Sequence, residues 1–370
     1  MASAIERISI SGFRSIKELD NLQLSQINVL VGANGSGKSN LISFFEMLNF
    51  MTSMALGNYV GLKGGADILL HSGSESVDQI SCEIHFKIFK KNQRHFDFDG
   101  YKTTLRRSET NTLYFNNEST YFRYFGKEHS PSDWHSLYNT STETGLSSGN
   151  DTHKTILFAM RNWKFFHFHD TSFRAKMKLP SDVNEGNYLK VNGDNIAAFL
   201  YNMELNHSSV YDQICETVRL VAPFFRRFNF EPDDSNRVVL KWRDEYGNSM
   251  MPSQFSDGTI RLICLISLLL QPNPPDFICL DEPELGLHPY AIEIIASLIK
   301  ERSMKSQMLI STQSPALLDF FEPDDVIVSE RQDGESTFRR LDSEELKYWM
   351  EEFSLSEAWK SNAFGGIPKL

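Results

Sequence analysis

A glycine-rich loop near the start of the chain contains the residue types that bind phosphate. Residues 32–39 read Gly-Ala-Asn-Gly-Ser-Gly-Lys-Ser, which fits the pattern G-x-x-x-x-G-K-S. Glycines let successive backbone N–H groups turn inward around phosphate oxygens, a turn that larger side chains would block. The Lys38 ammonium would add positive charge at the β- and γ-phosphates, and the Ser39 hydroxyl can ligate Mg²⁺. A nucleotide in this phosphate loop would contact Gly32, Asn34, Gly35, Ser36, Gly37, Lys38, Ser39 and Asn40.

Two acidic residues follow an apolar segment much later in the chain. Residues 277–280 are apolar, and Asp281 and Glu282 come directly after them. Such a segment predicts a buried strand, which would place this acidic pair at the carboxyl edge of a parallel sheet, where α/β proteins bind ligands. There Asp281 would hold Mg²⁺ directly or through water, and Glu282 would orient and deprotonate an attacking water.

A third polar motif precedes another apolar segment. Ser256, Asp257 and Gly258 stand just before residues 260–270, which predict a buried helix. A serine and a glycine at a helix N-terminus form a second anion site. One chain cannot easily use two separate phosphate sites on one nucleotide, whereas two copies that face each other head to tail can. The motif therefore predicts a dimer that encloses nucleotide.

The segments around these motifs predict an α/β protein with a large insertion. Residues 27–31 predict a strand and residues 40–50 a helix, which is the strand, loop and helix context that a phosphate loop needs. Short aromatic and β-branched segments between residues 80 and 125 predict antiparallel strands. Helices are predicted over 195–201, 210–220 and 344–353, and strands over 325–330 and 336–341. Because no sustained heptad repeat is present, we expect no coiled-coil arms.

Composition limits the partners that the chain can bind. Its 370 residues are 41% hydrophobic and carry a formal net charge of −11, so any contact with nucleic acid must come from a local patch. Residues 154–178 are basic and interleaved with aromatics, which is a composition that follows phosphates and stacks bases. A strand with a buried aromatic face and a solvated basic face fits the same pattern, and both interpretations stay open. The basic candidates are Lys164, Arg174, Lys176 and Lys178.

Cysteine usage and hydropathy indicate the compartment. The four cysteines are scattered without a C-x-x-C pair, and no apolar segment reaches the roughly 18 to 20 residues that a membrane-spanning helix needs. We therefore expect a cytoplasmic chain that does not enter a membrane.

In their order and spacing, the motifs resemble those of the RecF-like and SMC-like branch of ABC-type ATPases. The resemblance rests on the phosphate loop, on residues 256–258, on the run Asp-Glu-Pro-Glu-Leu-Gly-Leu-His-Pro at 281–289 and on Ser-Thr-Gln-Ser-Pro at 311–315. More closely, the chain is similar to the AAA-family ATPases of phage-defence operons and to overcoming-lysogenization-defect proteins, without a Toprim nuclease domain. We refer to residues 256–258 as the signature motif.

The resemblance implies a Mg²⁺-dependent ATPase that forms a head-to-tail homodimer, or a higher oligomer, and controls a separate effector such as a nuclease or toxin. It places the signature motif on the partner's ATP and His288 at the dimer interface, although a histidine in such a turn is also often structural. Gln313 stands at the switch position, where much of the family has histidine. A glutamine can hydrogen-bond a γ-phosphate or the attacking water but cannot become charged, so we expect slow hydrolysis.

The fold implied is an α/β P-loop NTPase of the ATP-binding-cassette type with an antiparallel β subdomain and an inserted α/β lobe. We expect residues 1–75 and 225–342 to form a discontinuous ATPase head and residues 76–130 an antiparallel β segment. Residues 131–224 would form the inserted lobe, and residues 343–370 a C-terminal helix and tail. Two alternatives remain: an ATP-gated scaffold that hydrolyses little, and a transporter motor subunit, which the long insertion and the Ser-Asp-Gly signature motif disfavour.

Overall fold

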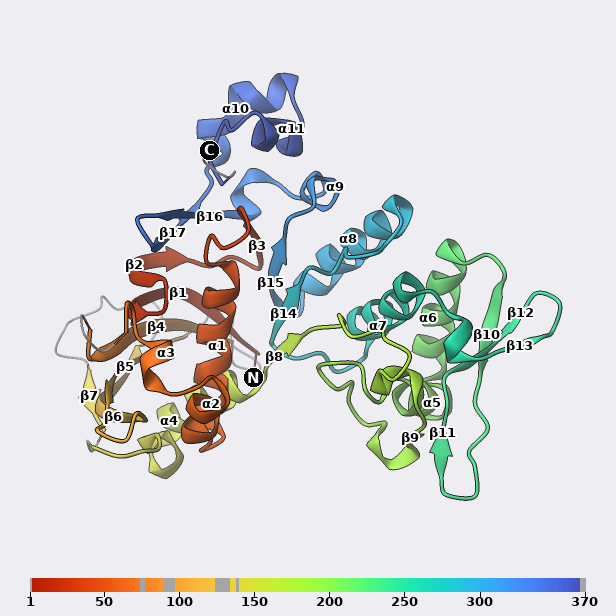
Figure 1. Cartoon of the computed structure of the whole chain (residues 1–370), viewed down its shortest axis with the longest axis horizontal. Coiled ribbons are helices and arrows are strands. Elements are labelled where there is room, and N and C mark those ends of the chain that lie inside the picture. The colour runs from red at the N-terminus through yellow and green to blue at the C-terminus, as the bar shows by residue number, and fades with distance from the viewer. Residues whose placement is uncertain (1, 74–76, 90–96, 124–133, 138–139, 367–370) are drawn as a thin grey trace. The chain divides into compact units, whose positions relative to one another are not determined.

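The computed structural model describes residues 2–73, 77–89, 97–123, 134–137 and 140–366 (Figure 1). The chain divides into two compact units, which are described separately. Unit 1 comprises residues 1–163, 307–313 and 321–370, and unit 2 comprises residues 164–306 and 314–320. These boundaries differ from the expected domain boundaries because Gln79–Phe89 pairs with the N-terminal strand Ala2–Phe13, and Asp97–Arg107 and Leu113–Arg123 continue the same sheet. A division into compact units does not show which segments fold on their own. The expected domain boundaries therefore stay a prediction.

Unit 1 contains an antiparallel sheet with the strand order β2-β1-β4-β5-β6-β7. Its strands are β1 (Ala2–Phe13), β2 (Ile16–Gln23), β4 (Gln79–Phe89), β5 (Asp97–Arg107), β6 (Leu113–Arg123) and β7 (His135–Ser136). Apolar residues alternate along β4, where Ile80, Ile84, Phe86 and Ile88 are buried, as expected for a strand with one face in the core. The predicted antiparallel strands are therefore present. Strand β6 runs without a break from Leu113 to Arg123, and residues 124 and 125 of the expected range lie outside the described residues.

A second group of strands in unit 1 carries the phosphate loop. The order is β17-β16-β3-β15, with β3 (Ile27–Val31) parallel to both β15 (Gln307–Thr312) and β16 (Val326–Gln332), and β17 (Glu335–Arg340) antiparallel to β16. Strand β3 is internal to the sheet and its last four residues are buried, so its carboxyl end is held firmly in place. The unit's α-helices are α1 (Lys38–Thr52), α2 (Leu56–Leu62), α3 (Ala66–Leu69), α4 (Asp151–Arg161), α10 (Ser343–Glu352) and α11 (Leu355–Lys360).

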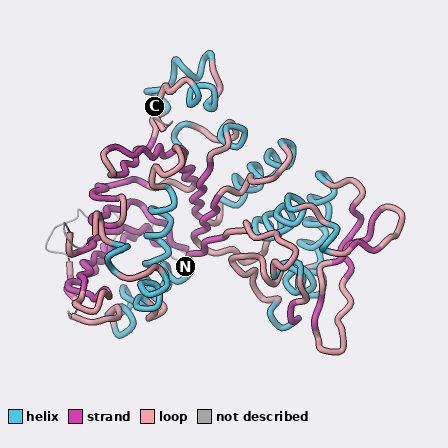
Figure 2. The backbone as a smooth tube through the Cα atoms, in the orientation of Figure 1, coloured by secondary structure: helices cyan, strands magenta, loops and turns pink. Residues whose placement is uncertain are grey.

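In unit 2 the helices contain more residues than the strands, and loops connect them (Figure 2). The helices are α5 (Ile196–Asn206), α6 (Ser208–Val221), α7 (Asp257–Leu270), α8 (Pro289–Ser303) and α9 (Pro315–Leu318). Helix α7 is buried on almost all sides from Ile260 to its end, and it packs against α6 and α8. A helix that is apolar all round belongs in a core, which is why a 14-residue segment this hydrophobic is found here.

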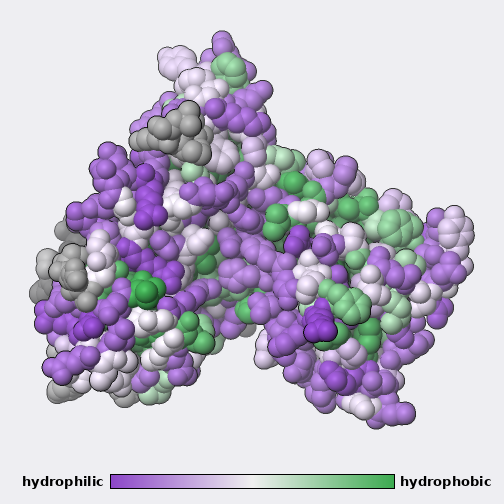
Figure 3. All heavy atoms as spheres, viewed as in Figure 1, coloured by the Kyte–Doolittle hydropathy of each residue, from purple (hydrophilic) through white to green (hydrophobic). Residues whose placement is uncertain are grey.

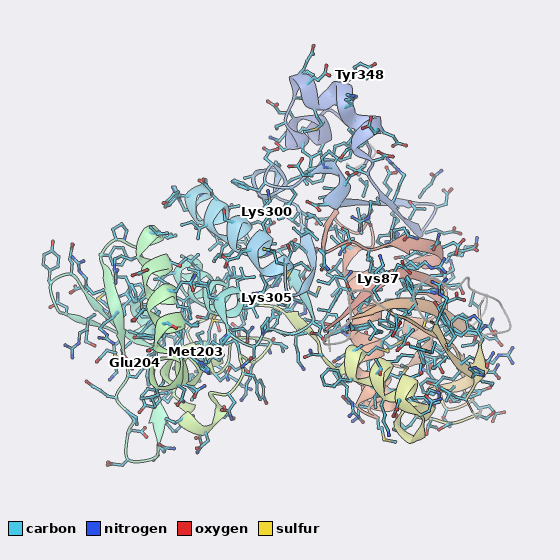
Figure 4. The ribbon with its side chains drawn as sticks, turned by 180° about the vertical axis from the view of Figure 1, so that it is seen from behind. Lys87, Met203, Glu204, Lys300, Lys305 and Tyr348 are labelled. Carbon is cyan, nitrogen blue, oxygen red and sulfur yellow. The ribbon has the colours of Figure 1, made fainter. Side chains whose placement is uncertain are left out.

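The strands of unit 2 are short. Strand β14 (Phe277–Asp281) lies next to β8 (Trp163–Phe166), which starts at the last residue of unit 1. Strands β10 (Phe225–Asn229), β12 (Lys241–Asp244) and β13 (Ser249–Met250) form a small antiparallel sheet, and β9 (Ser181–Asp182) pairs with β11 (Arg237–Val238). Glu204 of α5 accepts a hydrogen bond from Arg227 of β10 at 2.7 Å (Figure 4).

The basic and aromatic stretch 154–178 is not one strand. It contains the end of α4, the four-residue strand β8 and then irregular backbone with a short 3-10 turn at Lys176–Lys178. The described residues contain no helix that is both long and apolar enough to cross a membrane. In Figure 3, hydrophilic and hydrophobic side chains are interspersed over the face shown.

Candidate functional site

The phosphate loop links the end of β3 to the start of α1, as its residues predict. Gly37 caps α1 with a φ of 115°, a conformation that favours glycine. At Gly32, an added Cβ would lie 2.2 Å from the Ser329 carbonyl oxygen of β16, so only glycine fits. The Ser329 hydroxyl donates to the Ser36 carbonyl oxygen at 3.1 Å. Strand β16 therefore fixes the loop from one side, which the sequence pattern alone does not reveal.

The side chains of the phosphate loop suit an anion. Lys38 is 6% exposed, and its Nζ donates to the carbonyl oxygens of Gly32 at 2.7 Å and Ala33 at 3.1 Å, which holds the ammonium over the loop. The buried Ser36 hydroxyl has no hydrogen-bond partner among the described residues. Asn34, Gly35 and Ser39 are exposed. A buried cation beside an unsatisfied hydroxyl and open glycine backbone fits the phosphates of a nucleotide.

Asn40 connects the loop to the turn between β1 and β2. Its side-chain Nδ2 donates to the Ser15 hydroxyl at 2.6 Å, and the Arg14 guanidinium donates to its side-chain Oδ1 at 3.4 Å. The Ser336 hydroxyl also donates to that of Ser15 at 2.7 Å. Through these contacts Asn40 helps to hold the loop in place. Ser15 and Ser336 belong to no recognisable sequence motif, so the sequence alone does not identify them.

In unit 2, the acidic pair stands at the end of β14 as expected. Asp281 is the last residue of the strand, and Glu282 follows with a φ of 46°. This left-handed conformation costs a residue with a side chain about 1 to 2 kcal/mol. Leu285 N–H donates to the Glu282 carbonyl oxygen at 3.1 Å and closes the turn. Strain of this kind persists only where neighbouring contacts hold it, and such positions cluster at functional sites.

Two histidines that follow β8 contact Asp281. The His169 Nε2 lies 3.0 Å from the Asp281 carbonyl oxygen, and the His167 Nδ1 lies 3.7 Å from its carboxylate. They stand on irregular backbone beyond β8, because the strand ends at Phe166. A pocket of about 10 Å³, room for about one water, is lined by His169, Asp281 and Glu282 among others.

The signature motif forms the N-terminus of α7. The Ser256 hydroxyl accepts a hydrogen bond from Thr259 N–H at 3.1 Å and caps the helix. The ring of Phe255, the preceding residue, stacks on buried Trp242 with a centroid distance of 4.2 Å. The Asp257 carboxylate lies 3.4 Å from the Lys178 ammonium. Aromatic packing therefore positions an exposed helix N-terminus, where backbone N–H groups attract anions.

Two further candidates lie near element ends. His288 is exposed and caps α8, because its Nδ1 accepts a hydrogen bond from Tyr290 N–H at 3.3 Å. His288 thus has the structural role that a histidine in such a turn often has. Its place at a dimer interface stays a proposal. Gln313 follows the last residue of β15, in unit 1, and is half-buried.

The basic candidates have unlike surroundings. Lys178 donates to the Thr171 carbonyl oxygen at 2.6 Å as well as facing Asp257, and its side chain is 9% exposed. Lys164 lies on β8, where burial lowers the pKa of its ammonium. Lys176 is exposed and lies 3.7 Å from Asp194, and Arg174 is exposed. Only Arg174 and Lys176 therefore present charge outward, and a nucleic-acid patch stays a prediction that now rests on these two.

Oxygen donors suited to Mg²⁺ are present in both units. The exposed Ser39 hydroxyl in unit 1 and the Asp281 carboxylate in unit 2 are ligands of the type that Mg²⁺ takes. Within the described ranges, no group of three or more His, Cys, Asp or Glu side chains could hold a metal by itself. Mg²⁺ keeps several waters and shares substrate phosphates, so each of these oxygens is a candidate ligand in its own unit.

Comparisons with known proteins agree on the fold. A family model described as "AAA domain, putative AbiEii toxin, Type IV TA system" matches residues 27–319. No curated protein matches the chain significantly. A crystal structure of an SMC head bound to the C-terminal winged-helix domain of ScpA is similar, with a TM-score of 0.60 at 17% identity over 96% of this chain and 99% of that one.

Two archaeal SMC heads are also similar. The head from Pyrococcus furiosus, with an extended coiled coil and bound to the C-terminal domain of ScpA, has a TM-score of 0.57 at 15% identity and covers 95% of this chain and 99% of that one. The head from Pyrococcus yayanosii, with a coiled coil and joint, has a TM-score of 0.53 at 13% identity with the same coverage. These identities show the fold alone, and they confirm the predicted α/β class and the resemblance to SMC-like, ABC-type ATPase heads.

Proposed function

The chain belongs to this AAA-domain family and has the fold of an SMC-type ATPase head, and from that premise we propose that it hydrolyses ATP as a head-to-tail dimer that controls a separate effector. Membership of this family implies nucleotide binding. The observation that carries the proposal is the phosphate loop, with the Lys38 ammonium buried over it and the Ser39 hydroxyl exposed at its end.

Each motif has a role in this proposal. The loop backbone and Lys38 bind the phosphates, Gly32, Asn34, Gly35, Ser36, Gly37 and Asn40 complete the cradle or support it, and Ser39 and Asp281 ligate Mg²⁺, which neutralises phosphate charge when bound. Glu282 accepts a proton from the attacking water, and Gln313 hydrogen-bonds that water or the γ-phosphate. The left-handed backbone at Glu282 supports this assignment, because strained backbone of this kind clusters at functional sites.

The signature motif is assigned to the ATP of the partner protomer. Its support is an exposed helix N-terminus whose serine and glycine leave backbone N–H groups open to an anion. His288 is exposed four residues after Glu284 and would lie at the same interface. Two ATP molecules enclosed in this way make dimerisation depend on nucleotide.

Turnover separates an ATPase from an ATP-gated scaffold, which is the alternative favoured by the uncharged Gln313. The ATPase proposal predicts that Glu282→Gln lowers kcat by about 10²- to 10⁴-fold, the usual contribution of a general base, while ATP affinity stays unchanged. If wild type and Glu282→Gln both hydrolyse ATP near background while ATP still drives dimerisation, the scaffold alternative holds instead. A transporter motor subunit would be favoured only by co-purification with a membrane protein.

Sedimentation tests the dimer. Ser256→Arg should prevent ATP-dependent dimerisation, because the larger side chain blocks the contact between the signature motif and the partner's ATP. Binding of ATP by the monomer should stay intact. Ser354→Arg is the matched control, since Ser354 also caps a helix through its hydroxyl but lies in the C-terminal part of unit 1. Both variants lose a cap worth about 1 kcal/mol, so only the loss of the dimer distinguishes them. An ATP-dependent dimer that survives Ser256→Arg would contradict the head-to-tail arrangement.

A separate effector completes the proposal. The family description names a toxin of a type IV toxin–antitoxin system, and two of the similar SMC heads are bound to ScpA domains. The ScpA complexes support a partner protein, and the family description supports a toxin-related role. We place that role in the cytoplasm, in phage defence or DNA maintenance, with a nuclease or toxin as the protein controlled. Co-purification of the full chain with the product of the adjacent reading frame, with and without ATP, tests this; a complex that ignores ATP would argue against nucleotide control.

A further inference from the structure

Arg261 donates hydrogen bonds to three backbone carbonyl oxygens in unit 2. Its Nε donates to Phe168, its Nη2 to His169 and its Nη1 to Leu285, each at 3.0 Å. A guanidinium presents its donors in a rigid plane and stays charged at every physiological pH. The side chain therefore joins helix α7 to two irregular segments, one at Phe168 and His169 and one at Leu285.

Both of these segments adjoin the acidic pair. His169, whose carbonyl oxygen Arg261 binds, places its own Nε2 3.0 Å from the Asp281 carbonyl oxygen. Leu285 belongs to the turn that begins at Glu282, because its N–H donates to the Glu282 carbonyl oxygen at 3.1 Å. Arg261 is thus linked to Asp281 through His169, and to the strained backbone of Glu282 through Leu285.

The helix that carries Arg261 begins at the signature motif. Gly258, in its first turn, packs so closely on the turn after Glu282 that a Cβ there would lie 2.3 Å from the Gly286 carbonyl oxygen. A Cβ on Gly286, which has a φ of 74°, would in turn lie 2.8 Å from the Arg261 Nη1. Movement of the signature motif and of the acidic pair is therefore coupled through one cluster.

We propose that Arg261 is a positioning residue that couples the signature motif to the acidic pair of the same protomer. This inference rests on the proposed function, in which the signature motif serves the partner's ATP while Asp281 and Glu282 serve the protomer's own. Closure on one ATP then moves Arg261, and through it the catalytic groups at the other ATP. Hydrolysis at the two sites of the dimer is accordingly cooperative.

Steady-state kinetics of the full-length protein test the coupling. Wild type should show a Hill coefficient for ATP above 1, with 2 as the limit for two sites. Arg261→Gln should lower kcat by about 10- to 100-fold, the usual effect of misplacing catalytic groups by about 1 Å, and bring the Hill coefficient to about 1. The Kd for ATP of the monomer should stay within about threefold, and Arg261→Lys should restore kcat only in part because an ammonium cannot bind three carbonyls.

Arg302 provides the matched control. Its Nε donates to the Leu269 carbonyl oxygen at 2.5 Å and its Nη2 to that of Gln271 at 3.1 Å, so it also joins backbone segments of unit 2. These carbonyls are at the end of α7 and touch none of the motifs. Arg302→Gln should lower thermal stability at least as much as Arg261→Gln, with kcat per folded protein and the Hill coefficient unchanged.

A second pair of variants approaches Arg261 without replacing it. Gly286→Ala should crowd the guanidinium and reproduce the loss of kcat and of cooperativity. Gly247→Ala introduces a side chain at a similar φ, 83°, where no atom lies within 4 Å, and should change neither. This pair decides the matter if Arg261→Gln does not fold.

The outcomes separate the two proposals. If wild type neither hydrolyses ATP nor dimerises, the proposed function is wrong and the coupling is wrong with it. If wild type does both, but Arg261→Gln matches Arg302→Gln and Gly286→Ala matches Gly247→Ala in kcat and Hill coefficient, Arg261 is merely structural. The inference is then overturned while the proposed function stands.

Discussion

Replacing Gly32 with alanine tests how tightly strand β16 holds the phosphate loop. An ideal Cβ at this position would lie 2.2 Å from the Ser329 carbonyl oxygen and 2.8 Å from the Ser36 hydroxyl. Ordinary C···O contacts are no shorter than about 3.3 Å, so the loop and the strand must separate by about 1 Å. The Ser329 hydroxyl, which binds the Ser36 carbonyl oxygen at 3.1 Å, is then drawn away.

The magnitude follows from these two losses. Forcing an extra methyl group into a packed site costs about 1 to 3 kcal/mol, and losing the buried hydrogen bond about 1 kcal/mol more. We therefore expect Gly32→Ala to lower the free energy of unfolding by about 2 to 4 kcal/mol. Because the Gly32 carbonyl oxygen also holds the Lys38 ammonium at 2.7 Å, ATP affinity should fall by at least about tenfold, or about 1.4 kcal/mol.

Gly35→Ala is the control within the same loop. Gly35 has a φ of 77°, and no atom lies within 4 Å of an added Cβ. Its alanine variant therefore bears only left-handed strain of about 1 to 2 kcal/mol. Urea unfolding gives both stabilities, and calorimetric titration gives the ATP affinity. The reasoning is refuted if Gly32→Ala is as stable as Gly35→Ala and binds ATP like wild type.

Three further predictions concern other parts of the chain. Lys38→Ala should abolish ATP binding in a calorimetric titration, because no other phosphate-loop side chain supplies a cation, and retained affinity would contradict the assignment. Burial lowers the pKa of His153, whose Nδ1 accepts the Asn150 N–H at 3.2 Å, so stability should fall as pH drops below the unfolded value of about 6.5; denaturant melts at pH 7 and 5 should differ less for His153→Asn than for wild type. Replacing Arg174 and Lys176 with serine should reduce the salt slope of any DNA binding by about 2, and an unchanged slope would exclude this patch.

The motifs predicted local backbone well because their chemistry requires particular geometry. A lysine and a serine after glycines start a helix at Lys38, and two acids end an apolar strand at Asp281. The same is true of α7, where a capping serine precedes a continuous apolar segment. In each case the residue type and the backbone conformation depend on each other within a few positions, so spacing along the chain was enough.

Contacts between segments that are distant in the chain could not be predicted from the sequence. Nothing near Ser329 or Ser336 marks them as neighbours of the phosphate loop. The parallel pairing of β16 with β3 brings Ser329 there, and the antiparallel pairing of β17 with β16 brings Ser336. His167 and His169 lie beyond β8, which ends at Phe166. Their contacts with Asp281 come from irregular backbone that no periodicity in the sequence describes.

The acidic pair shows why a motif cannot decide between an ATPase and a scaffold. The backbone of Glu282 is left-handed at a cost of about 1 to 2 kcal/mol, and contacts on either side of the pair resist its relaxation. From the Asp281 side, His169 binds the strand end, and from the far side Arg261 binds Leu285 in the turn. On the proposed function the phosphate loop binds ATP in either case, and a scaffold would gain nothing from a carboxylate held under strain. We therefore expect Glu282 to serve hydrolysis, and we expect the uncharged Gln313 to make that hydrolysis slow.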